Sequence, residues 1–168
     1  MKKRYESRLF TLGLFVILGL GLLATALDPT GIASSNGDVI RIGTLTGVNQ
    51  VLFFVGVGMI LIGAVIRMVA IASLKRNFSG LLRIRDGHTL VKNGIYRWIR
   101  HPAYLGAIIL FLGIPVMASS LIGFLVMFLL VPYLLHRIKL EERMLAERFG
   151  AEYEEYIRQS KKLIPYLY

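Results

Sequence analysis

Long apolar runs, separated by short charged or polar stretches, dominate the pattern along this chain. The first run covers residues 9–27 behind a basic amino terminus, and the second covers residues 48–74. At a rise of about 1.5 Å per residue, either run is long enough for a helix to cross a hydrocarbon core of about 30 Å. Residues 28–47, rich in Gly, Ser and Thr, separate the two runs and predict a loop outside the membrane.

The first run also resembles the start of a signal peptide. It is long for that purpose and no small-residue cleavage site clearly follows it, so we expect a retained helix. In the second run, Gly56 and Gly63 offer one face for close packing against another helix. Arg67 lies late enough in that run to reach toward the interface, which favours a structural role.

A third apolar stretch, at residues 101–136, contains 36 consecutive residues without a formal charge. That length suits two short helices joined at Ser119-Ser120. Each arm of about 18 residues would rise roughly 27 Å, which just reaches across the membrane core. Pro115 and Pro132 are expected to kink the arms.

Apart from Arg67, the charged residues lie outside the apolar runs, mostly in the segments between and after them. Residues 137–168 alternate Glu with Lys and Arg, break at Gly150 and predict a helical tail outside the bilayer. With four spans, all but one of the 20 Lys and Arg residues fall on one side, the exception being Arg41 in the first loop. The positive-inside rule makes that side cytoplasmic.

The sequence therefore predicts an all-α integral membrane protein with about four transmembrane helices, a cytoplasmic connector and a helical carboxy-terminal tail. Residues 1–74 would form an amino-terminal helix pair. Residues 75–168 would form the connector, the helical hairpin and the tail, together one membrane domain with both termini cytoplasmic. Composition agrees, because 55% hydrophobic residues and a mean hydropathy of +0.63 are too apolar for a soluble fold.

Composition also excludes several kinds of chemistry. The net charge of +10 follows the membrane topology and no nucleic-acid motif interleaves the basic residues, so no nucleic acid partner is expected. The chain has no cysteine, which excludes disulfides, thiolate metal sites and a cysteine nucleophile. A metal site would have to use the three histidines, His88, His101 and His136. None of them has a histidine or carboxylate partner at the i,i+3 or i,i+4 spacing of metal ligands on a helix, so no metal is expected.

The basic and aromatic segment at residues 90–106 is the first candidate for chemistry. Asn93-Gly94 predicts a turn because both residues tolerate positive φ. Tyr96, Trp98 and Ile99 follow the turn and are expected to face lipid headgroups. The segment is therefore expected to lie at a membrane interface.

His101-Pro102 predicts a helix start, since the fixed φ of proline suits the first turn and its missing N–H costs nothing there. The unpaired N–H groups and the positive dipole end of that start, with Arg97 and Arg100 nearby, can hold an anionic group. A basic membrane anchor is the alternative interpretation.

A second candidate lies where the tail begins. Arg137 and Glu141 are i,i+4 and share one helix face. The short hairpin would return them to the depth of the His101-Pro102 helix start. A solvated charge pair is the alternative interpretation.

Taken together, the residues from about His88 to Pro165 resemble the isoprenylcysteine carboxyl methyltransferase family and its phospholipid methyltransferase relatives. The resemblance rests on HTLVKNGIYRWIRHPAYLG, an uncharged hairpin, RIKLEERMLAERFGAEYEEYI and a closing Leu-Ile-Pro, in family order and spacing. Residues 1–74 match in hydropathy alone. The resemblance implies a membrane methyltransferase that binds S-adenosylmethionine on the cytoplasmic side, under a carboxy-terminal lid, with a lateral opening for a lipid-like or prenylated methyl acceptor.

The resemblance also implies roles for particular residues. Arg137 matches the family's acceptor-side arginine and would orient the acceptor. The family's cofactor contacts would fall on ten residues: His88, Thr89, Leu90, Val91, Tyr96, His101, Pro102, Ala103, Tyr104 and Glu141. Ala103 stands where the family often has serine. The connector before His88 is shorter than the family's and lacks its glutamine, so cofactor contact by residues 77–87 stays open.

In that interpretation Glu141 would bind the ribose hydroxyls, the helix start would receive the methionine carboxylate, and Tyr96 and Tyr104 would pack near the sulfonium. A carboxylate acceptor needs no general base, so positioning in a water-poor site would carry the catalysis. Two other functions stay open at this point. One is an NADPH-dependent membrane enzyme like the sterol reductases, which share a similar RHP-containing hairpin, and the other is a non-catalytic lipid-binding membrane protein.

Overall fold

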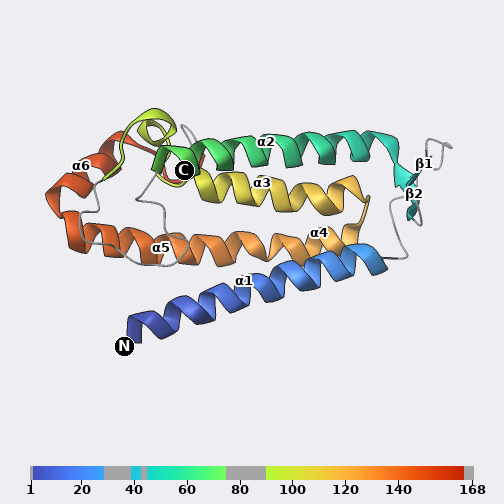
Figure 1. Cartoon of the computed structure of the whole chain (residues 1–168), viewed down its shortest axis with the longest axis horizontal. Helices are drawn as coiled ribbons and strands as arrows, with labels where there is room; N and C mark the ends of the chain where they lie inside the picture. Colours follow the sequence, from blue (N-terminus) through green and yellow to red (C-terminus); the bar gives the residue numbers. More distant parts are fainter. Residues whose placement is uncertain (1, 29–38, 43–44, 75–89, 165–168) are drawn as a thin grey trace.

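The computed structural model describes residues 2–28, 39–42, 45–74 and 90–164 of the chain. Its elements, in chain order, are α1 Lys2–Leu27, β1 Val39–Ile42, β2 Leu45–Asn49, α2 Gln50–Leu74, the 3-10 turn η2 Gly94–Arg97, α3 Pro102–Met117, α4 Leu121–Phe128, α5 Leu130–Phe149 and α6 Ala151–Gln159. Helices α2 and α3 and the arm formed by α4 and α5 run along the long axis, and α1 crosses that arm obliquely (Figure 1).

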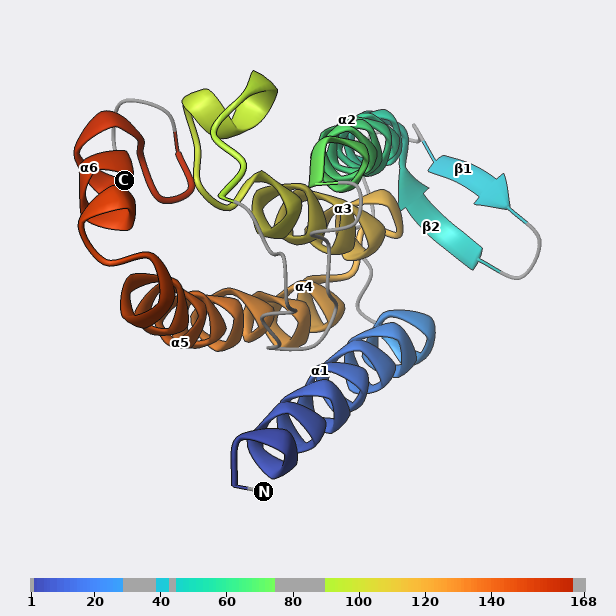
Figure 2. The same ribbon diagram turned by 60° about the vertical axis from the view of Figure 1, so that its left-hand side comes forward.

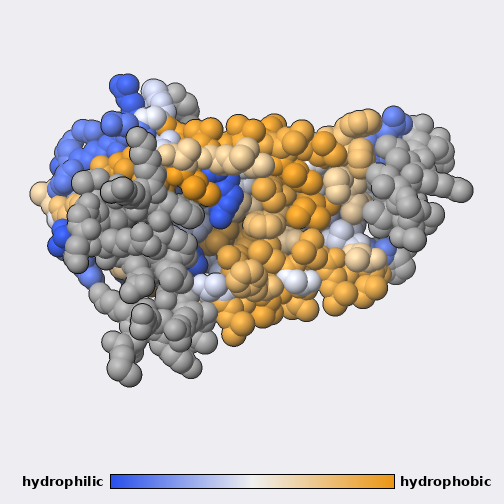
Figure 3. Space-filling model, viewed as in Figure 1, coloured by the Kyte–Doolittle hydropathy of each residue, from blue (hydrophilic) through white to orange (hydrophobic). Residues whose placement is uncertain are grey.

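Apolar helices form the body of the molecule. Three are long and apolar enough to cross a membrane, Phe10–Leu27, Gln50–Leu74 and Leu121–Phe149, and α3 adds a shorter apolar helix of 16 residues. Large hydrophobic side chains remain exposed on their outer faces, where lipid would cover them. The space-filling view shows this apolar belt beside the hydrophilic end that holds α6 (Figure 3). The chain is an integral membrane protein with the helical fold that the sequence predicts, whereas the count of about four spans stays a prediction.

The predicted helical hairpin is confirmed, with its turn at Ser119-Ser120 between α3 and α4. Ser119 adopts a left-handed φ of 56°, and its hydroxyl oxygen accepts from the backbone N–H of Asn49 at 2.9 Å. The Ser120 hydroxyl oxygen caps α4 by accepting from the Gly123 N–H at 2.9 Å, and the hydroxyl donates to Asp28 Oδ2 at 2.6 Å. The turn therefore ties the ends of α1 and α2 to the hairpin.

The two proline predictions have different outcomes. The helix breaks between α4 and α5 at Leu129, three residues before Pro132. Pro132 has no N–H to donate to the Phe128 carbonyl oxygen, and its ring crowds that carbonyl, which explains the break. Pro115 lies inside the last turn of α3, where the helix ends at Met117 without a comparable break before it. Gly150, with a φ of +50°, separates α5 from α6 as predicted.

The predicted polar loop contains a short antiparallel hairpin in addition. Strands β1 and β2 pair with the register Val39↔Asn49, Ile40↔Val48 and Ile42↔Leu45. The β-branched residues of the VIRI segment favour this pairing. The Gly and Ser residues around the segment are typical of loops, so the sequence did not predict the strands. It leads directly into α2.

Helices α2 and α3 pack backbone to backbone through glycines, which confirms the predicted Gly56 and Gly63 face. A Cβ built on Gly63 would lie 2.5 Å from the Leu110 nitrogen and 2.6 Å from the Gly106 carbonyl oxygen. Gly113 and Gly56 meet in the same way farther along α3. The two helices lie side by side in both ribbon views (Figures 1 and 2). This contact fixes the depth of α3 beside α2.

Arg67 adds a polar tie between the same two helices. Its Nη1 donates to the Ala103 carbonyl oxygen at 3.0 Å, in the first turn of α3. This bond supports the predicted structural role of Arg67. It holds the start of α3 against the late part of α2.

The glycine contact generates a matched pair of substitutions. Gly63→Ala should destabilise the protein by about 1–3 kcal/mol, because the new methyl group would force α2 and α3 apart. Gly58→Ala lies on the same helix, meets nothing within 4 Å and should be neutral or slightly stabilising. Thermal unfolding of both variants in one detergent would measure the difference. Equal midpoints for the two variants would contradict the backbone-to-backbone packing.

Candidate active site

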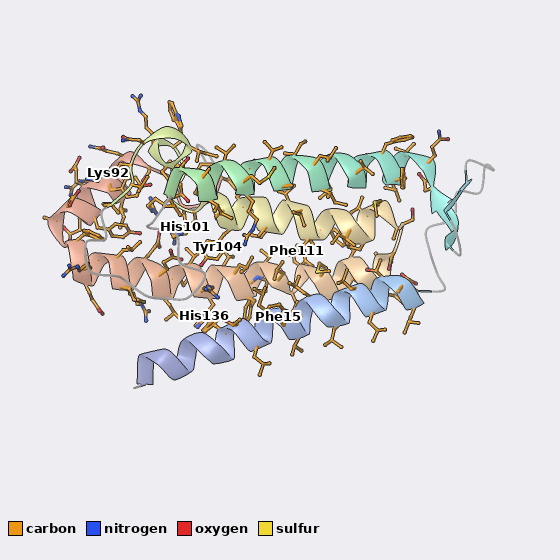
Figure 4. All side chains as sticks on the ribbon, in the orientation of Figure 1. Phe15, Lys92, His101, Tyr104, Phe111 and His136 are labelled. Carbon is orange, nitrogen blue, oxygen red and sulfur yellow. The ribbon has the colours of Figure 1, made fainter. Side chains whose placement is uncertain are left out.

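The site is built around the start of α3. Gly94 adopts a φ of +63° at the predicted Asn93-Gly94 turn and opens η2. His101 then caps α3, and Pro102 occupies its first turn, as the sequence predicts. The local sequence therefore places His101 and Tyr104 at one end of the bundle, on the side of α3 that faces α5 (Figure 4).

One prediction for the segment before α3 is wrong. Tyr96 and Ile99 do not face lipid headgroups, since each is only 5% exposed, whereas Trp98 is 54% exposed. The reason is the carboxy-terminal tail, which covers both buried residues. The Tyr156 hydroxyl donates to the Tyr96 carbonyl oxygen at 2.6 Å, and Ile99 pairs with Lys161 in a parallel β-bridge.

Arg137, Tyr104 and Glu141 form one hydrogen-bonded chain. The Tyr104 hydroxyl donates to Glu141 Oε2 at 2.8 Å and accepts from Arg137 Nε at 3.0 Å. Arg137 is buried, with 6% of its surface exposed. The predicted shared face of Arg137 and Glu141 is confirmed, and the alternative of a solvated charge pair is excluded because both meet the same α3 hydroxyl in a largely buried setting.

A second ionic cluster surrounds Glu142, the next residue along α5. Its Oε1 lies 3.0 Å from Arg100 Nε, and its Oε2 lies 3.3 Å from Lys162 Nζ. His101 Nε2 is 3.4 Å from Oε1, but the alignment is not that of a hydrogen bond. Glu142 therefore joins α5 to the α3 start and to the tail.

Two buried polar atoms among the described residues have no hydrogen-bond partner, His101 Nε2 and the Tyr153 hydroxyl oxygen. Such atoms are costly unless something satisfies them, and they are what a polar ligand would bind. His101 is 4% exposed and Tyr153 is 1% exposed. Both lie close to the ionic cluster, because Glu142 is 3.4 Å from the first and its charge acts on the second.

Burial keeps the neighbouring tyrosines neutral. Burial raises the pKa of the Tyr96 phenol, and the nearby Glu141 carboxylate raises it further. Burial likewise raises the pKa of Tyr153 and takes that of Tyr156 to about 12. These phenols act as hydrogen-bond groups and not as charges near neutral pH.

The structure brings most predicted site residues together and leaves others apart. His101, Pro102, Ala103 and Tyr104 open α3, and Tyr96, Arg137 and Glu141 surround that start. Leu90 and Val91 are half-buried in the irregular stretch before η2, and no hydrogen bond between described residues joins them to this group. His88 and Thr89, like residues 77–87, lie outside the described residues.

Sequence reasoning missed Glu142, Lys162 and Tyr153. The pair Glu141-Glu142 was visible, but spacing alone does not separate the roles of adjacent glutamates. Successive helical residues point about 100° apart, so only one of the two can face Tyr104. This difference in direction was the only sign in the sequence that Glu142 would contact a residue other than Tyr104.

The fold and this polar end define a helical integral membrane protein with a largely buried ionic site where α3 begins. The model of the isoprenylcysteine carboxyl methyltransferase family matches residues 56–147, which cover both α3 and the Arg137 to Glu142 segment. The chain belongs to that family.

Individual relatives agree with this assignment. The chain is 36% identical over 117 residues to a probable protein-S-isoprenylcysteine O-methyltransferase of Oryza sativa subsp. indica, covering 68% of this chain and 61% of the relative. It is 31% identical over 112 residues to the protein-S-isoprenylcysteine O-methyltransferase of Saccharomyces cerevisiae, covering 65% of this chain and 47% of the relative. The chain thus spans about three fifths or less of the length of these relatives.

A solved structure shares the fold. It is that of a eukaryotic intramembrane Ras methyltransferase, an isoprenylcysteine carboxyl methyltransferase, with a TM-score of 0.66 and 29% sequence identity. The match covers 70% of this chain and 43% of that one.

The bridging hydroxyl of Tyr104 generates a stability prediction. Tyr104→Phe keeps the ring but removes one partner from both Glu141 and Arg137, which should cost about 1–3 kcal/mol. Tyr156→Phe is the control, because it removes a single bond to a backbone carbonyl and should cost about 1 kcal/mol. Thermal unfolding of both variants measures the order. A smaller loss for Tyr104→Phe than for Tyr156→Phe would contradict the bridge.

Proposed function

We propose that this chain is an S-adenosylmethionine-dependent methyltransferase that methylates a lipid-like or prenylated acceptor, through a carboxylate or a related nucleophile. Membership of the family and the names of the relatives support this reaction. The observation that carries this proposal is the pair of hydrogen bonds that joins Arg137, Tyr104 and Glu141, which places a buried cation and an anion beside the start of α3.

The residues present fit this cofactor. S-adenosylmethionine supplies an electrophilic methyl group on a sulfonium, together with ribose hydroxyls and an α-carboxylate. Glu141 would bind the hydroxyls through charge-assisted hydrogen bonds, and the start of α3 would receive the carboxylate. His101 Nε2, buried without a partner, offers a further polar contact there. The rings of Tyr96 and Tyr104 would lie near the positive charge.

The remaining proposed cofactor contacts come from the family match. They are the backbone of Pro102 and Ala103 and the stretch formed by His88, Thr89, Leu90 and Val91. Ala103 already gives its carbonyl oxygen to Arg67, so this part of α3 is held in place before any ligand binds. Preorganisation of this kind lowers the cost of binding.

Arg137 would orient the acceptor. Its Nε donates to the Tyr104 hydroxyl, which orients the guanidinium, and a guanidinium is the side-chain group best suited to bind an anionic acceptor such as a carboxylate. Burial of Arg137 and the covering of the α3 start by the tail keep water out, which favours a reaction between opposite charges. A carboxylate acceptor needs no general base, so these residues act by positioning.

Family membership favours this reaction over both alternatives raised from the sequence, the NADPH-dependent sterol-reductase-like enzyme and the non-catalytic lipid-binding protein. We also propose that the acceptor enters from the bilayer. A prenylated protein, a phospholipid or a small thiol would each fit such a lateral opening.

The division of roles can be tested at the two α5 residues. Glu141→Gln should weaken the affinity for S-adenosylmethionine at least tenfold, because each charge-assisted bond is worth about 1.5–3 kcal/mol. Arg137→Ala should leave that affinity within a few-fold and abolish turnover. Calorimetric titration and single-turnover methyl transfer would separate the two effects. Equal losses of cofactor affinity in two folded variants would refute the division.

The proposed orientation places both termini and the active site in the cytoplasm, because all but one of the 20 basic residues then fall on that side. Epitope tags at either end should be protected from protease added outside intact cells. Digestion of the carboxy-terminal tag under those conditions would contradict the orientation.

A further inference from the structure

The carboxy-terminal tail is docked on the segment before α3 by backbone bonds. The Arg100 N–H donates to the Lys161 carbonyl oxygen at 2.8 Å, and the His101 N–H donates to the Lys162 carbonyl oxygen at 3.1 Å. The Lys161 N–H returns a bond to the Trp98 carbonyl oxygen at 3.0 Å. Figure 2 shows α6 folded back beside this segment. The docked tail therefore lies directly against His101, the residue that caps the start of α3.

The Arg100 side chain also binds the docked tail. Its guanidinium donates to the carbonyl oxygens of Ile157, at 3.3 Å, and of Ser160 where α6 ends. A cation in this place binds the carbonyls that a helix end leaves without partners. The same guanidinium reaches Glu142 Oε1 through Nε at 3.0 Å. Glu142 thus orients the group that caps α6.

Glu142 meets three segments at once. Arg100 comes from the connector, His101 from the α3 start and Lys162 from the tail, at 3.0, 3.4 and 3.3 Å. The side chains of Arg100, His101 and Glu142 are 8%, 4% and 15% exposed, so solvent screens these contacts little. By contrast, the Lys92 and Glu152 pair on the outer side of α6 is 37% and 55% exposed. Removing one partner from the Glu142 cluster should therefore cost more than removing one from this exposed pair.

We propose that Glu142 is a positioning residue that holds the tail over the start of α3 and so controls how long the cofactor stays bound. The inference rests on the proposed function. Glu141 faces Tyr104 and Glu142 faces Lys162 of the tail. The first glutamate would therefore contact the cofactor, and the second would keep the tail closed over the site. Loosening Glu142 lets the tail lift without removing any proposed cofactor contact.

The test uses the full chain in detergent, with S-adenosylhomocysteine as the probe. Glu142→Gln removes the charge at nearly constant volume, and the probe should dissociate about tenfold faster than from the wild-type chain. Lys162→Met loosens the same tie from the tail and should accelerate dissociation in the same direction. Glu152→Gln breaks the exposed pair on α6 and is the control, with no change expected. The KM for the acceptor should stay unchanged in all three variants.

A second measurement needs no cofactor. Trypsin cleaves after Lys161 and Lys162, whose carbonyls are engaged by Arg100 and His101, so cleavage requires an undocked tail. Glu142→Gln and Lys162→Met should raise the cleavage rate after Lys161 several-fold, and Glu152→Gln should not. Faster cleavage with unchanged probe dissociation would overturn the inference while leaving the proposed function intact. Failure of the wild-type chain to bind the probe would overturn both.

Discussion

The backbone contact between α2 and α3 is the constraint on which the site depends. Gly63 and Gly106 let the two helices approach until a single added methyl group would collide with the backbone. Because α3 begins only four residues before Gly106, this contact also sets where Pro102 lies, and Arg67 secures the same turn through the Ala103 carbonyl. The position of His101 and Tyr104 is therefore a consequence of helix packing and not of the loop before them.

Charged residues then assemble around that fixed start. Helix α5 brings Arg137 and Glu141 to the Tyr104 hydroxyl and Glu142 to Arg100, His101 and Lys162. Leaving the charge of Arg137, Arg100 or Glu142 unpaired in so buried a setting would be costly, so these groups hold one another in place. The result is a preorganised polar end on an apolar bundle, which is the arrangement that a methyl transfer governed by positioning requires.

Periodicity and charge in the sequence predict the helices, the Ser119-Ser120 turn, the Gly56 and Gly63 face and the helix start at Pro102, because each depends on local chemistry. The burial of Tyr96 and Ile99 was not predictable in the same way. It depends on the tail folding back across sixty residues of chain, and an aromatic residue beside a membrane span looks the same whether lipid or protein covers it. The separate roles of Glu141 and Glu142 likewise depend on tertiary contacts, which adjacent identical residues do not encode.

Cofactor binding is the most direct test of this account. Titration of the purified wild-type chain with S-adenosylhomocysteine in a calorimeter should show saturable binding at one site per chain. NADPH should give no heat under the same conditions. Saturable binding of NADPH with no response to S-adenosylhomocysteine or S-adenosylmethionine would contradict the account.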